Sequence, residues 1–140
     1  MAHPDFETLL NELLPFAQQT LDKQGGFYPF GAAMDRDGKV NYVMAQPDDN
    51  ENPAPQDVID LLVDGFRDRV PKDGLKAIGI CFDGRVVPPR ESTKSDAISF
   101  RFEHMSGEAV RVFLPYRKTL SGRVEYGELF ATAGSVSVFR

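Results

Sequence analysis

Cys81 and His104 are the two side chains whose chemistry could act on a substrate. A cysteine attacks as its thiolate, which forms in a partly exposed, cationic or helix-end environment. Cys81 instead follows the apolar run Ala77–Ile80 and precedes Phe82, and a lone cysteine in such a context behaves as a small buried hydrophobe. His104 closes the apolar face of a predicted strand and could serve as a general base, although histidines at strand ends are more often simply half-exposed. We therefore predict no catalytic residue.

The acidic and glycine-rich segments could hold a cation or a phosphate. Four carboxylates recur at spacings of three and four on one outer helix face: Asp57, Asp60, Asp64 and Asp68. A metal site on that row would need a further ligand source, and the sequence places none beside it, so the row reads as a solvated surface. Gly25-Gly26 ends a helix, whereas a phosphate loop opens one. Asp35–Gly38 is too short for a calcium loop and fits a hairpin turn. We predict no metal and no cofactor.

Aromatic, proline and arginine residues gather near three predicted strand ends, in Phe27–Phe30, Val87–Arg90 and Leu114–Arg117. Tyrosine and arginine are enriched at protein-binding surfaces because they bury a large area at low entropic cost. The binding residues predicted on this basis are Tyr28, Arg90, Tyr116, Arg117 and Tyr126. The alternative is that Phe27 and Phe30 belong to the core and that the prolines protect exposed strand edges.

Hydrophobic periodicity predicts the elements that would position these residues. The first half of the chain reads as helix, hairpin, loop and helix. We expect a helix from about Pro4 to Gly25-Gly26, kinked or split at Pro15; strands over Phe27–Met34 and Lys39–Ala45; a mobile acidic loop over Gln46–Pro55; and a helix from about Gln56 to Val70.

The second half changes to a period of two, with glycine turns at Asp83-Gly84, Ser106-Gly107 and Ser121-Gly122. We expect strands over Leu75–Phe82, Arg85–Val87, Ala97–Met105, Glu108–Arg117 and Arg123–Phe130, with Val136–Phe139 closing the sheet. The predicted fold is one α+β domain over residues 1–140, in the order α-β-β-α-β-meander. A single antiparallel sheet of five to seven strands would carry two helices, mainly on one face.

Composition narrows the classes of protein to consider. The net charge of −5 divides into −8 for residues 1–70 and +3 for residues 71–140. Glutamates interrupt the arginines of the second half, so we predict no nucleic-acid binding. The longest uncharged stretches are too short to span a bilayer, and the acidic N-terminus does not resemble a secretory signal, so we expect a soluble protein. A single cysteine fits a reducing compartment, which favours the cytoplasm.

Two stretches carry a resemblance: Gly-Gly-Phe-Tyr-Pro-Phe-Gly-Ala at Gly25–Ala32 and Phe-Leu-Pro-Tyr-Arg at Phe113–Arg117. In these the chain resembles a group of small uncharacterised bacterial proteins. That resemblance implies a bacterial source and supplies no activity, cofactor or catalytic residue. The order of elements also resembles that of profilin-like and roadblock-type modules, which serve mostly as interaction platforms, an analogy at the level of fold alone.

These observations favour a small non-enzymatic binding or regulatory protein that acts through protein–protein contacts. An antiparallel sheet with an open edge also predicts self-association, with a homodimer expected. The alternative function is an immunity protein or an effector chaperone, which the small size and acidic pI permit. A small hydrolase using Cys81 or His104 comes third.

Overall fold

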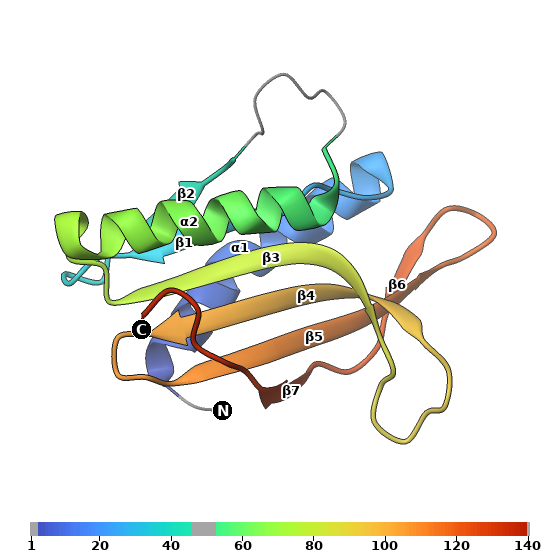
Figure 1. Cartoon of the computed structure of the whole chain (residues 1–140). Helices are drawn as coiled ribbons and strands as arrows, with labels where there is room; N and C mark the ends of the chain where they lie inside the picture. Colours follow the sequence, from blue (N-terminus) through green and yellow to red (C-terminus); the bar gives the residue numbers. More distant parts are fainter. Residues whose placement is uncertain (1–2, 46–52, 140) are drawn as a thin grey trace.

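The computed structural model describes residues 3–45 and 53–139 and shows two helices and one open antiparallel sheet of seven strands (Figure 1). The predicted α+β class is therefore confirmed. The elements are α1 (Pro4–Gln24), β1 (Phe30–Met34), β2 (Val40–Val43), α2 (Pro55–Asp73), β3 (Ala77–Val86), β4 (Ser95–His104), β5 (Ala109–Lys118), β6 (Val124–Tyr126) and β7 (Phe130–Ala133). The strands lie in the order β2-β1-β3-β4-β5-β6, and β7 pairs with the other half of β5. Neither helix is long and apolar enough to cross a membrane.

The helices cover opposite faces of the sheet, so the prediction of two helices mainly on one face is wrong. Side chains of α1 pack with Ala32 and Cys81 on what we call the α1 face. Those of α2 pack with Ala33, Ile78 and Ile80 on the α2 face, and Figure 1 shows α2 in front of the sheet with α1 behind it. The physical reason is that β1 and the first half of β3 are apolar at every position, and such strands need cover on both sides.

Helix α1 is continuous through Pro15, so the predicted division into two segments does not occur. Proline removes one backbone donor, which leaves the carbonyl of Asn11 one turn earlier without its usual partner. Asn11 and Pro15 are both exposed, so water can solvate that carbonyl. Gly25 ends the helix in the left-handed conformation at φ 77°, with its N–H donating to the carbonyl of Leu21.

Three of the four predicted glycine turns are confirmed, and Asp83-Gly84 is wrong. Those two residues lie inside β3, paired with Ile98 and Ala97 of β4. A Cβ atom at position 84 would lie 2.8 Å from Ser99 Oγ of the neighbouring strand, so a larger residue there would have to displace that side chain. The connection from β3 to β4 instead runs through the proline-containing segment 87–94.

The end of the chain departs from the prediction in two ways. The strand expected over Arg123–Phe130 is divided into β6 and β7, between which the Gly127 N–H donates to the carbonyl of Pro115. Residues 134–139 form no strand and cross the α2 face (Figure 1). Val138 is buried there beside α2. Most of the predicted acidic loop, residues 46–52, lies outside the described residues.

Candidate functional site

Cys81 lies in β3 under α1 and is fully buried, as predicted. Burial raises the pKa of its thiol well above the ordinary value, and the negative charge of Asp83 raises it further. A thiol in this environment stays protonated and out of reach of a substrate. The structure therefore gives Cys81 a packing role.

His104 is buried at the end of β4 and uses both ring nitrogens. Nε2 lies 2.9 Å from Asp5 Oδ2, and Nδ1 accepts a hydrogen bond from the Ser106 N–H. His104 is therefore the neutral tautomer with its proton on Nε2, and it has no free nitrogen to accept another proton. His3 stacks on its ring at a centroid distance of 3.7 Å. We call His3, Asp5 and His104 the His-Asp clasp, because it ties the start of α1 to the end of β4.

The carboxylate of Asp5 is the centre of this clasp. Its burial raises the pKa, but the hydrogen bond from His104 and the positive charge of Lys76 are among the causes that lower it more, so the pKa lies below its ordinary value. Lys76 Nζ is 3.6 Å from Asp5 Oδ2. His3 was not selected from the sequence. Its position directly before Pro4, at the predicted start of the helix, was the signal that it could cap that helix. Its side chain caps α1 by accepting from the Asp5 N–H.

The His-Asp clasp also has the residue types of a metal centre, since its three ligand atoms lie within 4.8 Å of one another. A metal ion binds in the plane of an imidazole ring, about 2.0 Å from the nitrogen. The two rings are stacked with an interplanar angle of 21°, so one ion between them would not lie in the plane of both rings. Both Nδ1 atoms already accept backbone hydrogen bonds. The arrangement is that of a structural clasp.

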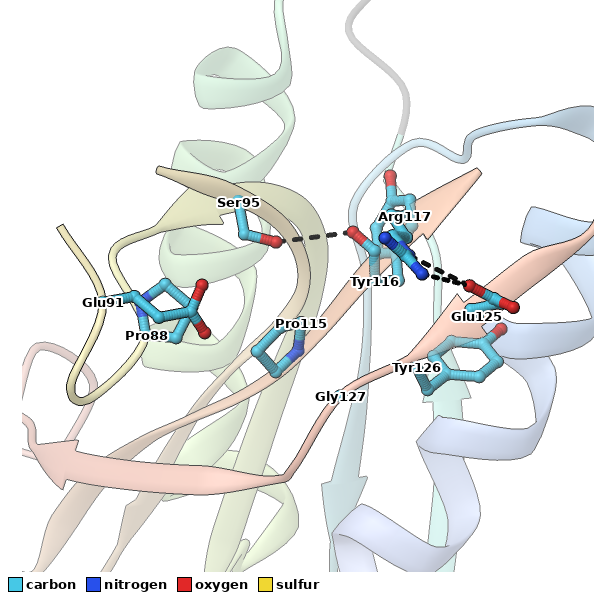
Figure 2. Close-up of a pocket in the computed structure, with 9 residues that line it drawn as sticks. All are labelled: Pro88, Glu91, Ser95, Pro115, Tyr116, Arg117, Glu125, Tyr126 and Gly127. Carbon is cyan, nitrogen blue, oxygen red and sulfur yellow. Dashed lines mark hydrogen bonds and ion pairs between the residues drawn. The ribbon is translucent and has the colours of Figure 1, made fainter. Parts of the chain in front are cut away.

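The predicted binding residues fall on two separate surfaces. The first is a groove between the β3–β4 connection and strands β5 to β7 (Figure 2). It consists of an open pocket of about 560 Å³ and a second of about 390 Å³, and the two share Pro88, Glu91, Pro115 and Gly127. We call this the strand-end groove. Tyr116, Arg117 and Tyr126 line its first pocket and Arg90 lines the second.

Two of the predicted binding residues in the strand-end groove, Arg117 and Tyr116, already have partners within the chain. Arg117 places Nε and Nη2 each 2.9 Å from Glu125 Oε1 across the β5–β6 pair (Figure 2). Tyr116 is only 5% exposed and donates to Asp83 Oδ1 at 2.6 Å, so its predicted exposure is wrong. Burial raises the pKa of Tyr116 far above its ordinary value, and the hydrogen bond to Asp83 adds to the shift. Arg90 is exposed, in the left-handed conformation at φ 68°.

Tyr28 lies on the second surface, beside three residues that sequence reasoning did not select. Tyr28 is 52% exposed, Phe16 38%, Tyr42 51% and Met44 67%. Tyr28, Phe16 and Met44 line a hollow of about 460 Å³, and the Tyr42 ring lies 6.1 Å from that of Phe16. We call these four residues the aromatic patch. It joins the second half of α1, the α1–β1 connection and the β2 edge of the sheet.

The rings of the aromatic patch are held in place from below. Phe16 packs edge-on against the buried Phe30 at 5.0 Å, and Phe27 packs on Phe30 at 5.9 Å. The Tyr42 hydroxyl donates to the backbone carbonyl of Glu12 at 2.7 Å, which fixes β2 against α1. An available signal for this surface was Phe16, an apolar residue outside the buried stripe of its helix. The alternative that placed Phe27 and Phe30 in the interior is right for Phe30, while Phe27 is partly buried beside it.

The acidic row on α2 is exposed, as predicted, at all four positions. Its described partners come from α2 itself: Gln56 donates to Asp60, and Arg67 lies 3.9 Å from Asp64. Such weak contacts leave the row as a negatively charged surface.

Comparison with known proteins gives no relative: no family model matches the chain, and no curated protein or solved structure matches it. The resemblance to small uncharacterised bacterial proteins stays a prediction.

Proposed function

We propose that this chain is a small non-enzymatic binding protein, bacterial and cytoplasmic, and that the aromatic patch is its main contact surface. The supporting observation is that three large exposed side chains, those of Phe16, Tyr28 and Met44, line one hollow. The exposed ring of Tyr42 lies beside Phe16. Single exposed hydrophobic residues are normal on a protein surface, but a contiguous group is typical of an interaction site. The free buried thiol of Cys81 supports a reducing location.

Two side chains of the aromatic patch are already fixed before a partner binds, which favours binding. Rings that are already fixed lose little conformational entropy when a partner covers them, so more of the burial energy appears as affinity. Tyr42 is fixed by its hydrogen bond to Glu12 and Phe16 by its packing on Phe30. The strand-end groove supports the proposal less, because Arg117 and Tyr116 are engaged within the chain.

The two alternative functions differ in how well the structure supports them. The structure gives little support to a hydrolase, because Cys81 is fully buried and His104 uses both ring nitrogens. An immunity protein or an effector chaperone remains the alternative kind of binding protein. The exposed acidic row on α2 would suit the basic partner that such a protein could hold.

Capture from a native cell extract tests the proposal. Immobilised wild-type protein is compared with the double variant Tyr28→Ser/Met44→Ser and with Leu120→Ser as the matched control. Leu120 is a fully exposed apolar residue on the β5–β6 turn and does not line the hollow of the patch. We expect the patch variant to lose specific partners that the wild type and the control retain, with all three proteins melting at similar temperatures. Equal capture by all three would contradict the proposal.

A further inference from the structure

Strand β7 is an outer strand of the sheet with one open side. It pairs with β5 through Val110–Phe113, and no described strand pairs with its other side. Ala131, Thr132 and Ala133 are exposed. Alternate backbone N–H and C=O groups of an outer strand point away from the sheet, where they can pair with another strand.

This edge lacks the features that usually prevent strand pairing. Proteins protect their sheet edges with charged residues, prolines or bulges. The stretch Leu129–Phe139 contains no charged residue and no proline. The opposite edge differs, because β2 follows Lys39 and carries the bulky Tyr42, whose hydroxyl is tied to α1. Among the described strand edges, β7 is therefore the best suited to pair with another strand.

We propose that β7 pairs antiparallel with β7 of a second copy, joining two sheets into one about a twofold axis. Residues opposite each other in an antiparallel pair point to the same face. Phe130 and Thr132 are opposite Phe113 and Arg111, on the α2 face, while Ala131 lies on the α1 face. A register centred on Ala131 places Phe130 opposite Thr132 of the second copy, and an aromatic residue beside a β-branched one is a favourable cross-strand pair.

The charges at the two ends of the β7 edge favour a second copy of this chain as the strand that pairs with it. Glu128 is exposed just before β7, and Arg111 is exposed beside Thr132. Neither forms an ion pair with another described residue. The twofold arrangement brings Glu128 of each copy to the Gly134 end of the other edge, the end beside which Arg111 lies. Opposite charges therefore attract across both ends of the interface, and the two Glu128 side chains are kept apart.

The dimer will be weak, because a strand of four residues buries little area by itself. Stable interfaces bury about 1,200 to 2,000 Å² in total. Here the partly exposed Leu129 and the stacked rings of Phe113 and Phe130 would add to the strand pairing. The proposal is independent of the aromatic patch, which lies at the other edge of the sheet.

Sedimentation equilibrium from about 5 to 500 μM protein tests the proposal by charge reversal. We expect the wild-type mass to rise from 15.6 kDa towards twice that value as concentration increases. Arg111→Glu alone and Glu128→Lys alone should each weaken association about tenfold or more. An equimolar mixture of the two variants should regain wild-type association, because both cross-copy pairs are then attractive in the heterodimer.

Two variants separate this interface from other modes of association. Ala131→Lys places two lysines against each other at the axis and should abolish the dimer. Asn41→Lys on the β2 edge should leave it unchanged. A wild type that stays at the monomer mass throughout would overturn the proposal, as would single variants that associate like the wild type or a mixture that regains nothing.

Discussion

Tyr116 of β5 donates a hydrogen bond to Asp83 of β3 at 2.6 Å, over the strand β4 that separates them. The contact explains why a tyrosine in the Phe-Leu-Pro-Tyr-Arg stretch is buried, and why Asp83 lies within a strand. Burial raises the pKa of Asp83, and the nearby Asp96 carboxylate raises it too, while the hydrogen bond from Tyr116 partly opposes both. The net shift is upward.

Removing the Tyr116 hydroxyl should destabilise the protein. Tyr116→Phe keeps the ring in the core and leaves Asp83 without its donor, so we expect a loss of about 1 to 3 kcal/mol in the free energy of unfolding. Urea unfolding at pH 7 measures this loss. Tyr126→Phe is the matched control, because the Tyr126 hydroxyl has no hydrogen-bond partner among the described atoms, and it should cost little. Equal effects of the two variants would contradict this role for Tyr116.

Asp83→Asn should change how stability depends on pH. An acid whose folded pKa is raised favours folding in its protonated form, so its contribution is gained as pH falls from above the raised pKa towards the ordinary value of about 3.9. Asparagine keeps an acceptor for Tyr116 and does not titrate. The variant should therefore be at least as stable as the wild type at pH 7, with its advantage shrinking as pH falls towards 4. Unfolding free energies between pH 4 and pH 7 check this, and an advantage that grows on acidification would be inconsistent with it.

Asp5 should show the opposite dependence. Its folded pKa is lowered, so its contribution is present above the ordinary pKa of about 3.9 and is lost as pH falls through the folded value. Asp5→Asn should cost about 1 to 2 kcal/mol at pH 6, and the difference from the wild type should shrink as pH falls through the lowered folded pKa of Asp5. A difference that persists at low pH would exclude the charge of Asp5 as its cause.

Cys81 should react slowly with thiol reagents in the native protein and quickly after denaturation, because it is fully buried and its thiol pKa is raised. Cys81→Ala should cost about 1 kcal/mol, whereas Cys81→Asp should cost far more because it buries a charge. Rapid native labelling would show an accessible thiolate and contradict the packing role.

Glu103 should hold the C-terminal segment on the sheet. Its Oε1 accepts backbone N–H groups of Ser137, Val138 and Phe139 at 2.8, 2.7 and 3.3 Å. Glu103→Ala leaves these donors without their acceptor, so their amide hydrogen exchange should accelerate at least about tenfold. Glu103→Gln keeps one carbonyl oxygen and should accelerate exchange less. Unchanged exchange in both variants would show that the other contacts hold the segment, namely the packing of Val138 and the hydrogen bond from Arg67 to the Ser137 carbonyl.

Local signals in the sequence predicted the elements well. The stop at Gly25 and the turns at Gly38, Gly107 and Gly122 depend on positive φ angles that glycine adopts readily, and all four are confirmed. The Asp83-Gly84 dipeptide failed because the same residue type can also mark close approach between strands. A single sequence does not separate these two uses of glycine.

The candidate sites were harder to predict because they depend on contacts between distant segments. Burial of Tyr116 depends on Asp83, which lies two strands away in the sheet. The aromatic patch joins Phe16, Tyr28 and Met44 from three different elements or connections. Of the five predicted binding residues, only Tyr28 belongs to the aromatic patch. The composition of a strand end does not show which other strand ends lie next to it in the folded protein.

The affinity of a captured partner for two single variants tests most directly whether the aromatic patch is a binding surface. Tyr28→Ala should weaken binding about 10-fold to 30-fold, as expected for loss of an interface tyrosine. Leu120→Ala should change affinity by less than about twofold, because its side chain lies outside the patch. Both variants should keep the wild-type melting temperature. Equal affinities of the two variants for the partner would contradict this role of the aromatic patch.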